Sequence, residues 1–113
     1  VTGVDVRGAS DYCLDNYGRK VTIPTGYYKV LLGYKKGGQF AGMASTGGYT
    51  GIAFYFDHKY YTVSHETIMG QAMSIDALED DLEIDFFVNL PSKIGATFAA
   101  KVESTVDNWW YKK

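Results

Sequence analysis

The amino-acid sequence predicts an α+β fold, a mostly antiparallel sheet with two helices, formed by residues 1–113 as one segment. Strand signals dominate the first half, where β-branched and aromatic residues alternate between turn residues. After residue 73 the apolar residues recur at helical spacing. The chain has 113 residues, 46% of them hydrophobic, which suffices for one core, and no shift in composition marks a second domain.

The charge and the cysteine content set loose bounds on function. A formal net charge of -2 gives no global attraction to nucleic acid, so any basic surface would be local. Cys13 is the single cysteine, which excludes an intramolecular disulfide. No apolar run approaches the roughly 18 residues of a membrane span, so we expect no membrane partner.

The first predicted strand is the opening stretch "VTGVDV", residues 1–6. It lacks a starting Met and is rich in β-branched residues, which suggests a strand already under way whose upstream neighbours have been removed. Such a segment is expected to expose a sheet edge and an apolar face. It would then self-associate or bind the missing N-terminal half.

Two further strands are predicted at residues 27–34, "YYKVLLGY", and 51–57, "GIAFYFD". Both faces of the first are largely apolar, as in an interior strand, and the second repeats the pattern as its neighbour. The connection between them is rich in glycine, at positions 33, 37, 38, 42, 47 and 48. It matches neither phosphate-binding pattern, GxxxxGK[ST] or strand-GxGxxG-helix, and we interpret it as a mobile hairpin connection.

The first helix is predicted in "SIDALEDDLEIDFFVNLPSK", residues 74–93. Ser74 is a good N-cap, and Ile75, Leu78 and Leu82 form a seam at helical spacing. The helix should end early and be followed by an apolar plug at residues 86–87. The stretch carries six carboxylates, namely Asp76, Glu79, Asp80, Asp81, Glu83 and Asp85. They lack the central glycine of a calcium loop, so a solvated helix face is favoured over a metal site.

The second helix is predicted after Pro91, with Ser92 as its cap and an apolar stripe at four-residue intervals: Ile94, Phe98, Val102 and Val106. In the tail, Trp109 and Trp110 are expected to close one edge of the core. The alternative is that they stack on a base or a sugar.

No constellation of reactive residues amounts to an active site. The two histidines, His58 and His65, each neighbour a carboxylate, but their spacing fixes no geometry for a metal or a general base. Nothing places a base beside Cys13. The sequence therefore predicts no catalytic, cofactor-binding or metal-binding residue in this chain.

The ordered motifs resemble the C-terminal half of the DNA/RNA non-specific endonucleases, the ββα-metal or His-Me finger nucleases. These motifs are "VTG", "VTIPTGYYKVLL", "GIAFYFD", "MSIDALEDDLEIDFFVNLP" and "AKVESTVDNWW". In the family the fourth reads like "sIdelExxTGldFFpxLP". The chain departs from it at residues 81–83, Asp-Leu-Glu, where the family usually has Thr-Gly before "ldFF".

The resemblance implies that this stretch is the C-terminal portion of a metal-dependent hydrolase acting on DNA and RNA. The family's Asp-Arg-Gly-His motif and its metal-binding Asn precede the "VTG" strand, so this chain alone is expected to be inactive. Magnesium or manganese and a nucleic acid are expected to bind the intact protein, which by family resemblance is secreted or periplasmic. The alternative is a non-catalytic binding domain of a secreted protein that uses surface aromatics.

Overall fold

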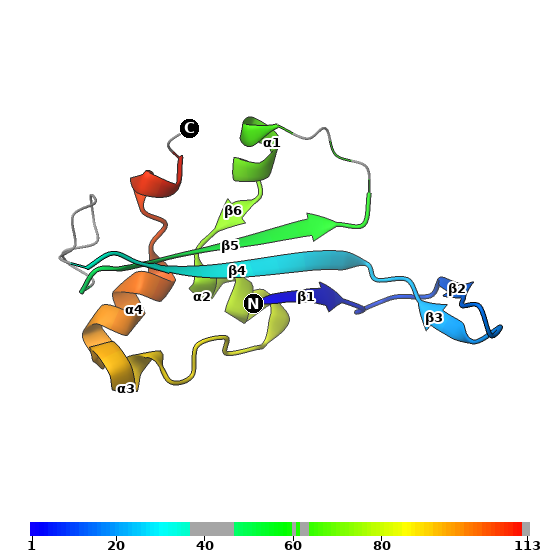
Figure 1. The fold of residues 1–113 in the computed structure, drawn as a ribbon, viewed down its shortest axis with the longest axis horizontal. Helices are drawn as coiled ribbons and strands as arrows, with labels where there is room; N and C mark the ends of the chain where they lie inside the picture. The colour runs from blue at the N-terminus through cyan, green and yellow to red at the C-terminus, as the bar shows by residue number, and fades with distance from the viewer. Residues whose placement is uncertain (37–46, 60, 62–63, 112–113) are drawn as a thin grey trace.

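The computed structural model describes residues 1–36, 47–59, 61 and 64–111 (Figure 1). Its main sheet has four antiparallel strands in the order β1-β4-β5-β6. They are β1 (Thr2–Asp5), β4 (Gly26–Tyr34), β5 (Tyr49–Asp57) and β6 (Ala72–Met73). A separate antiparallel hairpin consists of β2 (Tyr12–Leu14) and β3 (Lys20–Thr22). The helices are α1 (His65–Met69), α2 (Ile75–Leu82), α3 (Leu90–Ile94), α4 (Ala96–Ser104) and the 3-10 helix η2 (Asn108–Tyr111).

The α+β class and the antiparallel sheet are confirmed, but the expectation of two helices is wrong, because the described residues form four α-helices. The helix expected after Pro91 is divided at Gly95, whose φ of +93° breaks the helical backbone. Its start is also earlier than expected, with Leu90 as first residue and Asn89 rather than Ser92 at the cap. The break rotates the apolar stripe, so Phe98 is exposed while Ala99 is buried.

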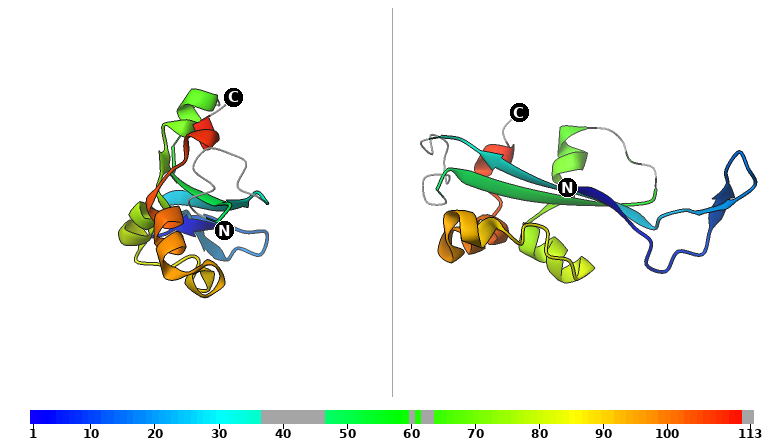
Figure 2. Two further views of the ribbon diagram at one scale, coloured as in Figure 1. Left: turned by 90° about the vertical axis from the view of Figure 1, so that its left-hand side faces the viewer. Right: turned by 60° about the horizontal axis from the view of Figure 1, so that its bottom comes forward.

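The helices lie on both sides of the β4–β5 pair (Figure 2). Helices α2, α3 and α4 cover one side, and α1 and η2 lie on the other. No described helix is long and apolar enough to cross a lipid bilayer.

Strands β4 and β5 pair along their full lengths, from Gly26 opposite Asp57 to Tyr34 opposite Tyr49, which confirms them as neighbours in a hairpin. On the side that α2, α3 and α4 cover, Val30 and its partner Ala53 are fully buried. The mobility expected for the glycine-rich connection concerns residues 37–46, which lie outside the described part of the chain.

Helix α2 follows the sequence prediction closely. The Ser74 hydroxyl caps it by accepting the N–H of Ala77 at 3.2 Å. Ile75 and Leu78 are fully buried against Val30 and Ala53, and the half-buried Leu82 packs at the rim. The apolar plug that was expected at residues 86–87 packs against the same core.

Strand β1 is one of the two edge strands of the sheet within the described residues, and β6 is the other. On the side of the sheet away from α2, Val4 and its partner Tyr27 are exposed. On the side that α2 covers, Val30 is buried. β1 is thus an edge strand, with the exposed side chains of Val4 and Tyr27 on the side of the sheet away from α2. Its pairing with a second copy or an upstream segment stays a prediction.

The β2–β3 hairpin makes the molecule elongated. It extends beyond the end of β4, and all six residues of its two strands are exposed. The radius of gyration is 16.7 Å with extents of 53 × 32 × 23 Å, whereas a compact chain of this length has about 13 Å. We call residues 12–22 the arm.

Candidate functional site

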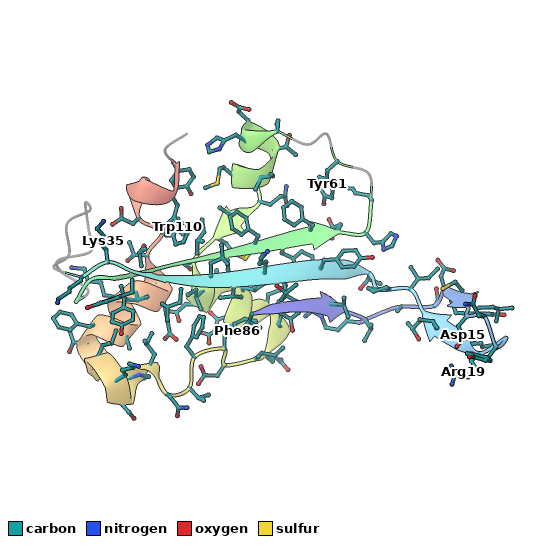
Figure 3. All side chains as sticks on the ribbon, in the orientation of Figure 1. Asp15, Arg19, Lys35, Tyr61, Phe86 and Trp110 are labelled. Atoms are coloured by element: carbon teal, nitrogen blue, oxygen red, sulfur yellow. The ribbon has the colours of Figure 1, made fainter. Side chains whose placement is uncertain are left out.

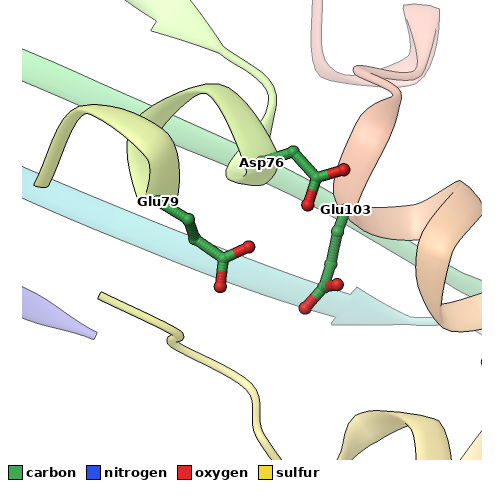
Figure 4. A group of neighbouring side chains, drawn as sticks. All are labelled: Asp76, Glu79 and Glu103. Atoms are coloured by element: carbon green, nitrogen blue, oxygen red, sulfur yellow. The ribbon is translucent and has the colours of Figure 1, made fainter. Parts of the chain in front are cut away.

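Three carboxylates meet between α2 and α4 and form the candidate site, which we call the acidic cluster (Figure 4). Asp76 and Glu79 come from α2, Glu103 comes from α4, and one oxygen of each lies within 4.8 Å of the others. Across the described part of the chain, this is the single group of three or more potential metal ligands that lie together.

The backbone at Gly51 on β5 explains why the two helices come close enough to form the cluster. A Cβ atom there would lie 2.5 Å from Cδ1 of Ile75 on α2 and 3.4 Å from Cγ1 of Val102 on α4. The missing side chain lets both helices pack on one point of the strand. Glu103 follows Val102 directly and is thereby carried to the acids of α2.

Burial changes the protonation of the cluster. It is the main cause that raises the pKa of Glu79 to about 7. The hydrogen bond from the N–H of Phe86 lowers this pKa, whereas the nearby charges of Glu103 and Asp85 raise it further. The pKa of Glu103 is also raised, first by burial and then by Asp76 and Asp85. The cluster therefore holds a proton more readily than ordinary surface acids do.

Glu79 also has a structural contact. Its Oε2 atom accepts the backbone N–H of Phe86 at 2.9 Å, which ties the end of α2 to the apolar plug. Chemically, three carboxylates could share a proton, or could bind a hard divalent cation such as calcium or magnesium through oxygen. Neither a histidine nor a cysteine belongs to the group.

The sequence interpretation of the six carboxylates is correct for four of them and wrong for two. Asp80, Asp81, Glu83 and Asp85 are exposed, as expected of a solvated helix face. Asp76 and Glu79 are half-buried. The reason is long-range: α4 covers that side of α2, and Glu103 gave no signal in the sequence that it would lie there.

Changing Glu79 to glutamine is expected to stabilise the protein at pH 8 by on the order of 2 kcal/mol. The folded state binds a proton at Glu79 between about pH 4.5, the ordinary value, and about pH 7, while the unfolded state does not. Stability at this group therefore falls as pH rises through that window. The neutral amide keeps an oxygen for the N–H of Phe86 and removes the effect.

Urea denaturation at pH 5 and at pH 8 measures this. Asp80→Asn, an exposed acid on the same helix, is the matched control and should change the pH dependence little. If Glu79→Gln destabilises the protein at both pH values, the charge of Glu79 has a partner, such as a bound cation, that stabilises it.

A second polar network, not expected from the sequence, lies at the end of β1. The Asp5 carboxylate is buried and accepts three side-chain bonds from Arg7: Nε to Oδ1 at 3.0 Å and to Oδ2 at 3.1 Å, and Nη2 to Oδ2 at 2.8 Å. It also accepts the Tyr55 hydroxyl at 2.6 Å. Arg7 in turn reaches Asp81 of α2, with Nη2 3.2 Å from Oδ2. The network connects β1, β5 and α2 and serves the fold.

The remaining residues considered from sequence are not brought together. The Tyr27 hydroxyl lies 2.8 Å from Nδ1 of the exposed His58, His65 begins α1, and Cys13 is exposed on β2. Nε1 of Trp110 donates to Thr50 at 2.9 Å, so this ring packs on the sheet as expected. The side chain of Trp109 lies outside the described part of the structure.

Comparison with known proteins gives no match: no family model, no curated protein and no solved structure matches the chain.

Proposed function

We propose that this chain is the C-terminal portion of a metal-dependent, non-specific DNA/RNA endonuclease that hydrolyses phosphodiester bonds. The observation that carries the proposal is the order of the sequence motifs, from "VTG" through "IPTGYYKV" and "GIAFYFD" to "SIDALEDDLEIDFF". Each occurs once, in the order in which the nuclease family has them.

A backbone feature at residue 83 supports the resemblance. Glu83 follows α2 in the left-handed conformation, with φ of +58°, and is the one residue other than glycine with positive φ among those described. It directly precedes "IDFF", where the family has the glycine of its Thr-Gly pair before "ldFF". Glycine adopts this conformation without strain, so a left-handed residue at this position is compatible with the glycine of the family pattern.

The arrangement of the motifs is that of a scaffold. "IPTGYYKV" leads into β4, "GIAFYFD" lies in β5 beside it, and "SIDALEDDLEIDFF" provides α2 and the plug that cover their shared core. In the proposed nuclease these parts brace the sheet that holds the catalytic half. Secretion or periplasmic export is part of the same proposal.

The reaction needs a base that activates water and a divalent ion on the scissile phosphate. The resemblance puts both before β1, as a His and an Asn, with magnesium or manganese as the ion. The residues described here do not supply that set: His58 and His65 belong to no ligand group, and the acidic cluster contains only carboxylates. We therefore derive no catalytic step from this chain.

The chain alone is expected to cleave neither plasmid DNA nor RNA with magnesium or manganese, because base and metal ligand are missing. The test compares it with the polypeptide that includes the residues encoded before Val1, which should contain Asp-Arg-Gly-His and be active. An alanine at that His is the control and should abolish cleavage.

Two results contradict the proposal. One is an upstream sequence that lacks the Asp-Arg-Gly-His motif. The other is metal-dependent cleavage by the chain alone that disappears in His58→Ala or His65→Ala, which would locate the active site within these residues.

A further inference from the structure

The arm is a highly exposed element of the described structure. It is a two-stranded hairpin, which is marginally stable by itself in water, and it projects from the sheet with no described element packed on its strands. Figure 3 shows its far end, with Asp15 and Arg19 at the turn.

In the turn of the arm, the acidic side chain of Asp15 is largely covered and the basic side chain of Arg19 is exposed. The Asp15 carboxylate accepts the backbone N–H groups of Tyr17 and Arg19 at 2.8 and 2.9 Å, and Nε of Arg19 at 2.8 Å. The Asp15 side chain is only 26% exposed, whereas that of Arg19 is 73% exposed. Asp15 accepts Nε of Arg19, and the remaining N–H donors of the guanidinium are thus available to a ligand from solvent.

Two tyrosines of the arm each have a cation over the ring. The Arg19 guanidinium carbon lies 5.1 Å from the centroid of Tyr17, and Nζ of Lys20 lies 4.5 Å from that of Tyr12. The rings themselves are open, with Tyr17 84% and Tyr12 51% exposed. A ring has two faces, so a cation over one leaves the other for a planar ligand.

We propose that the arm binds single-stranded nucleic acid, with unpaired bases stacking on Tyr17 and Tyr12 and with Arg19 and Lys20 meeting the phosphates. Aromatic side chains with cationic side chains beside them on an open surface are the means by which proteins hold single strands without reading sequence. This site is separate from the acidic cluster and requires neither metal nor base, so it does not depend on the proposed nuclease activity.

Charge selects this ligand over the others. The arm contains two basic residues and one acidic residue, so it is net positive on a chain of formal net charge -2. Arg19 and Lys20 therefore give the phosphates of a polyanion a local attraction that the net charge of the chain does not provide. A neutral sugar would gain nothing from the cations. A duplex hides the base faces on which the tyrosines would stack.

The test is an NMR titration of the ¹⁵N-labelled 113-residue chain, without metal, with a mixed-sequence 12-nucleotide single strand as DNA and as RNA. We expect shifts confined to residues 12–22. With two phosphate contacts, the logarithm of the association constant should fall with the logarithm of salt concentration with a slope of about -1.4. Tyr17→Ala should weaken binding about tenfold, whereas Tyr17→Phe, which keeps the ring, should bind like the wild type.

Matched controls lie elsewhere on the surface. Tyr34→Ala changes a tyrosine that is 60% exposed on β4, and Lys101→Ser changes an exposed lysine of α4; neither should alter binding. Arg19→Ser with Lys20→Ser should remove most of the salt dependence. The spectrum of the unbound variants shows whether the hairpin is still formed.

Shifts outside the arm, equal shifts with a neutral oligosaccharide, tighter binding of duplex than of single strand, or arm shifts that depend on protein concentration alone would each overturn the proposal. The last would instead indicate a second copy as partner. Failure of this test leaves the nuclease proposal standing, because that proposal is decided by the upstream sequence and by cleavage.

Discussion

Replacing Asp5 with asparagine is expected to lower the free energy of unfolding by about 3 kcal/mol, because one partner of a buried, charge-assisted network is lost. The Asp5 side chain is 4% exposed and receives bonds from both Arg7 and Tyr55. An amide of the same shape cannot accept all of these donors. Urea denaturation of the full chain, followed by circular dichroism, measures the loss.

Tyr55→Phe is the matched control, since it removes one donor to Asp5 and leaves the ring in the core. It should cost less, about 1 to 2 kcal/mol. Burial is the first cause that raises the pKa of Tyr55 to about 12, so its hydroxyl stays a donor throughout the neutral range. If Asp5→Asn were as stable as the wild type, the network would not hold β1 to β5.

The same carboxylate should give the protein a sensitivity to acid. Hydrogen bonds from Arg7 and then from Tyr55 hold the pKa of Asp5 well below its usual range. A lowered folded-state pKa contributes stability that is present above the unfolded value, near 3.8, and is lost as pH falls through the folded value. The wild type should therefore lose stability below about pH 4 more steeply than Asp5→Asn.

The elements that depend on neighbouring residues could be predicted from the sequence. Ser74 three positions before Ala77 fixes the start of α2, and the apolar residues on both faces of "YYKVLLGY" indicate that β4 is an interior strand. Each of these signals lies within a few residues of sequence. Helix-capping residues and the periodicity of apolar residues can therefore be recognised directly in the sequence.

The features that depend on distant residues could not. Tyr55 is fifty positions from Asp5, and Glu103 is twenty-four positions from Glu79, so neither partner is visible in a local pattern. A weak signal existed for one of them: aspartate is uncommon in strands, and Asp5 in "VTGVDV" marked a position that needed a partner.

Two local signals in the sequence point to features that the predictions above do not include. Gly95 lies between Ile94 and Phe98 of the apolar stripe, and a glycine within a helical pattern indicates a possible helix end, which is where the structure divides the helix. The two strands of the arm have only three residues each, too few for an alternation of apolar and polar residues to be recognised. The turn residues "DNYG" at 15–18 are what could have indicated a hairpin there.

Leu78 joins the fold to the acidic cluster, and its replacement by alanine is expected to cost about 3 kcal/mol. The side chain is fully buried between α2 and the β4–β5 pair, where Val30 and Ala53 contact it, so truncation leaves a cavity that the sheet cannot fill. Denaturation in urea at constant pH measures the loss. Leu82→Ala, at the half-buried rim of the same seam, is the control and should lose less than half as much.

The same variant tests whether burial sets the protonation of the cluster. Glu79 lies next to Leu78 on α2, and burial is the first cause of its raised pKa. A helix that packs less closely admits water, so the pKa of Glu79, measured by ¹³C NMR of the carboxyl group, should fall from about 7 toward its ordinary value in Leu78→Ala. In Leu82→Ala it should change less. An unchanged pKa together with the full loss of stability would show that neighbouring carboxylates, rather than burial, hold the proton on Glu79.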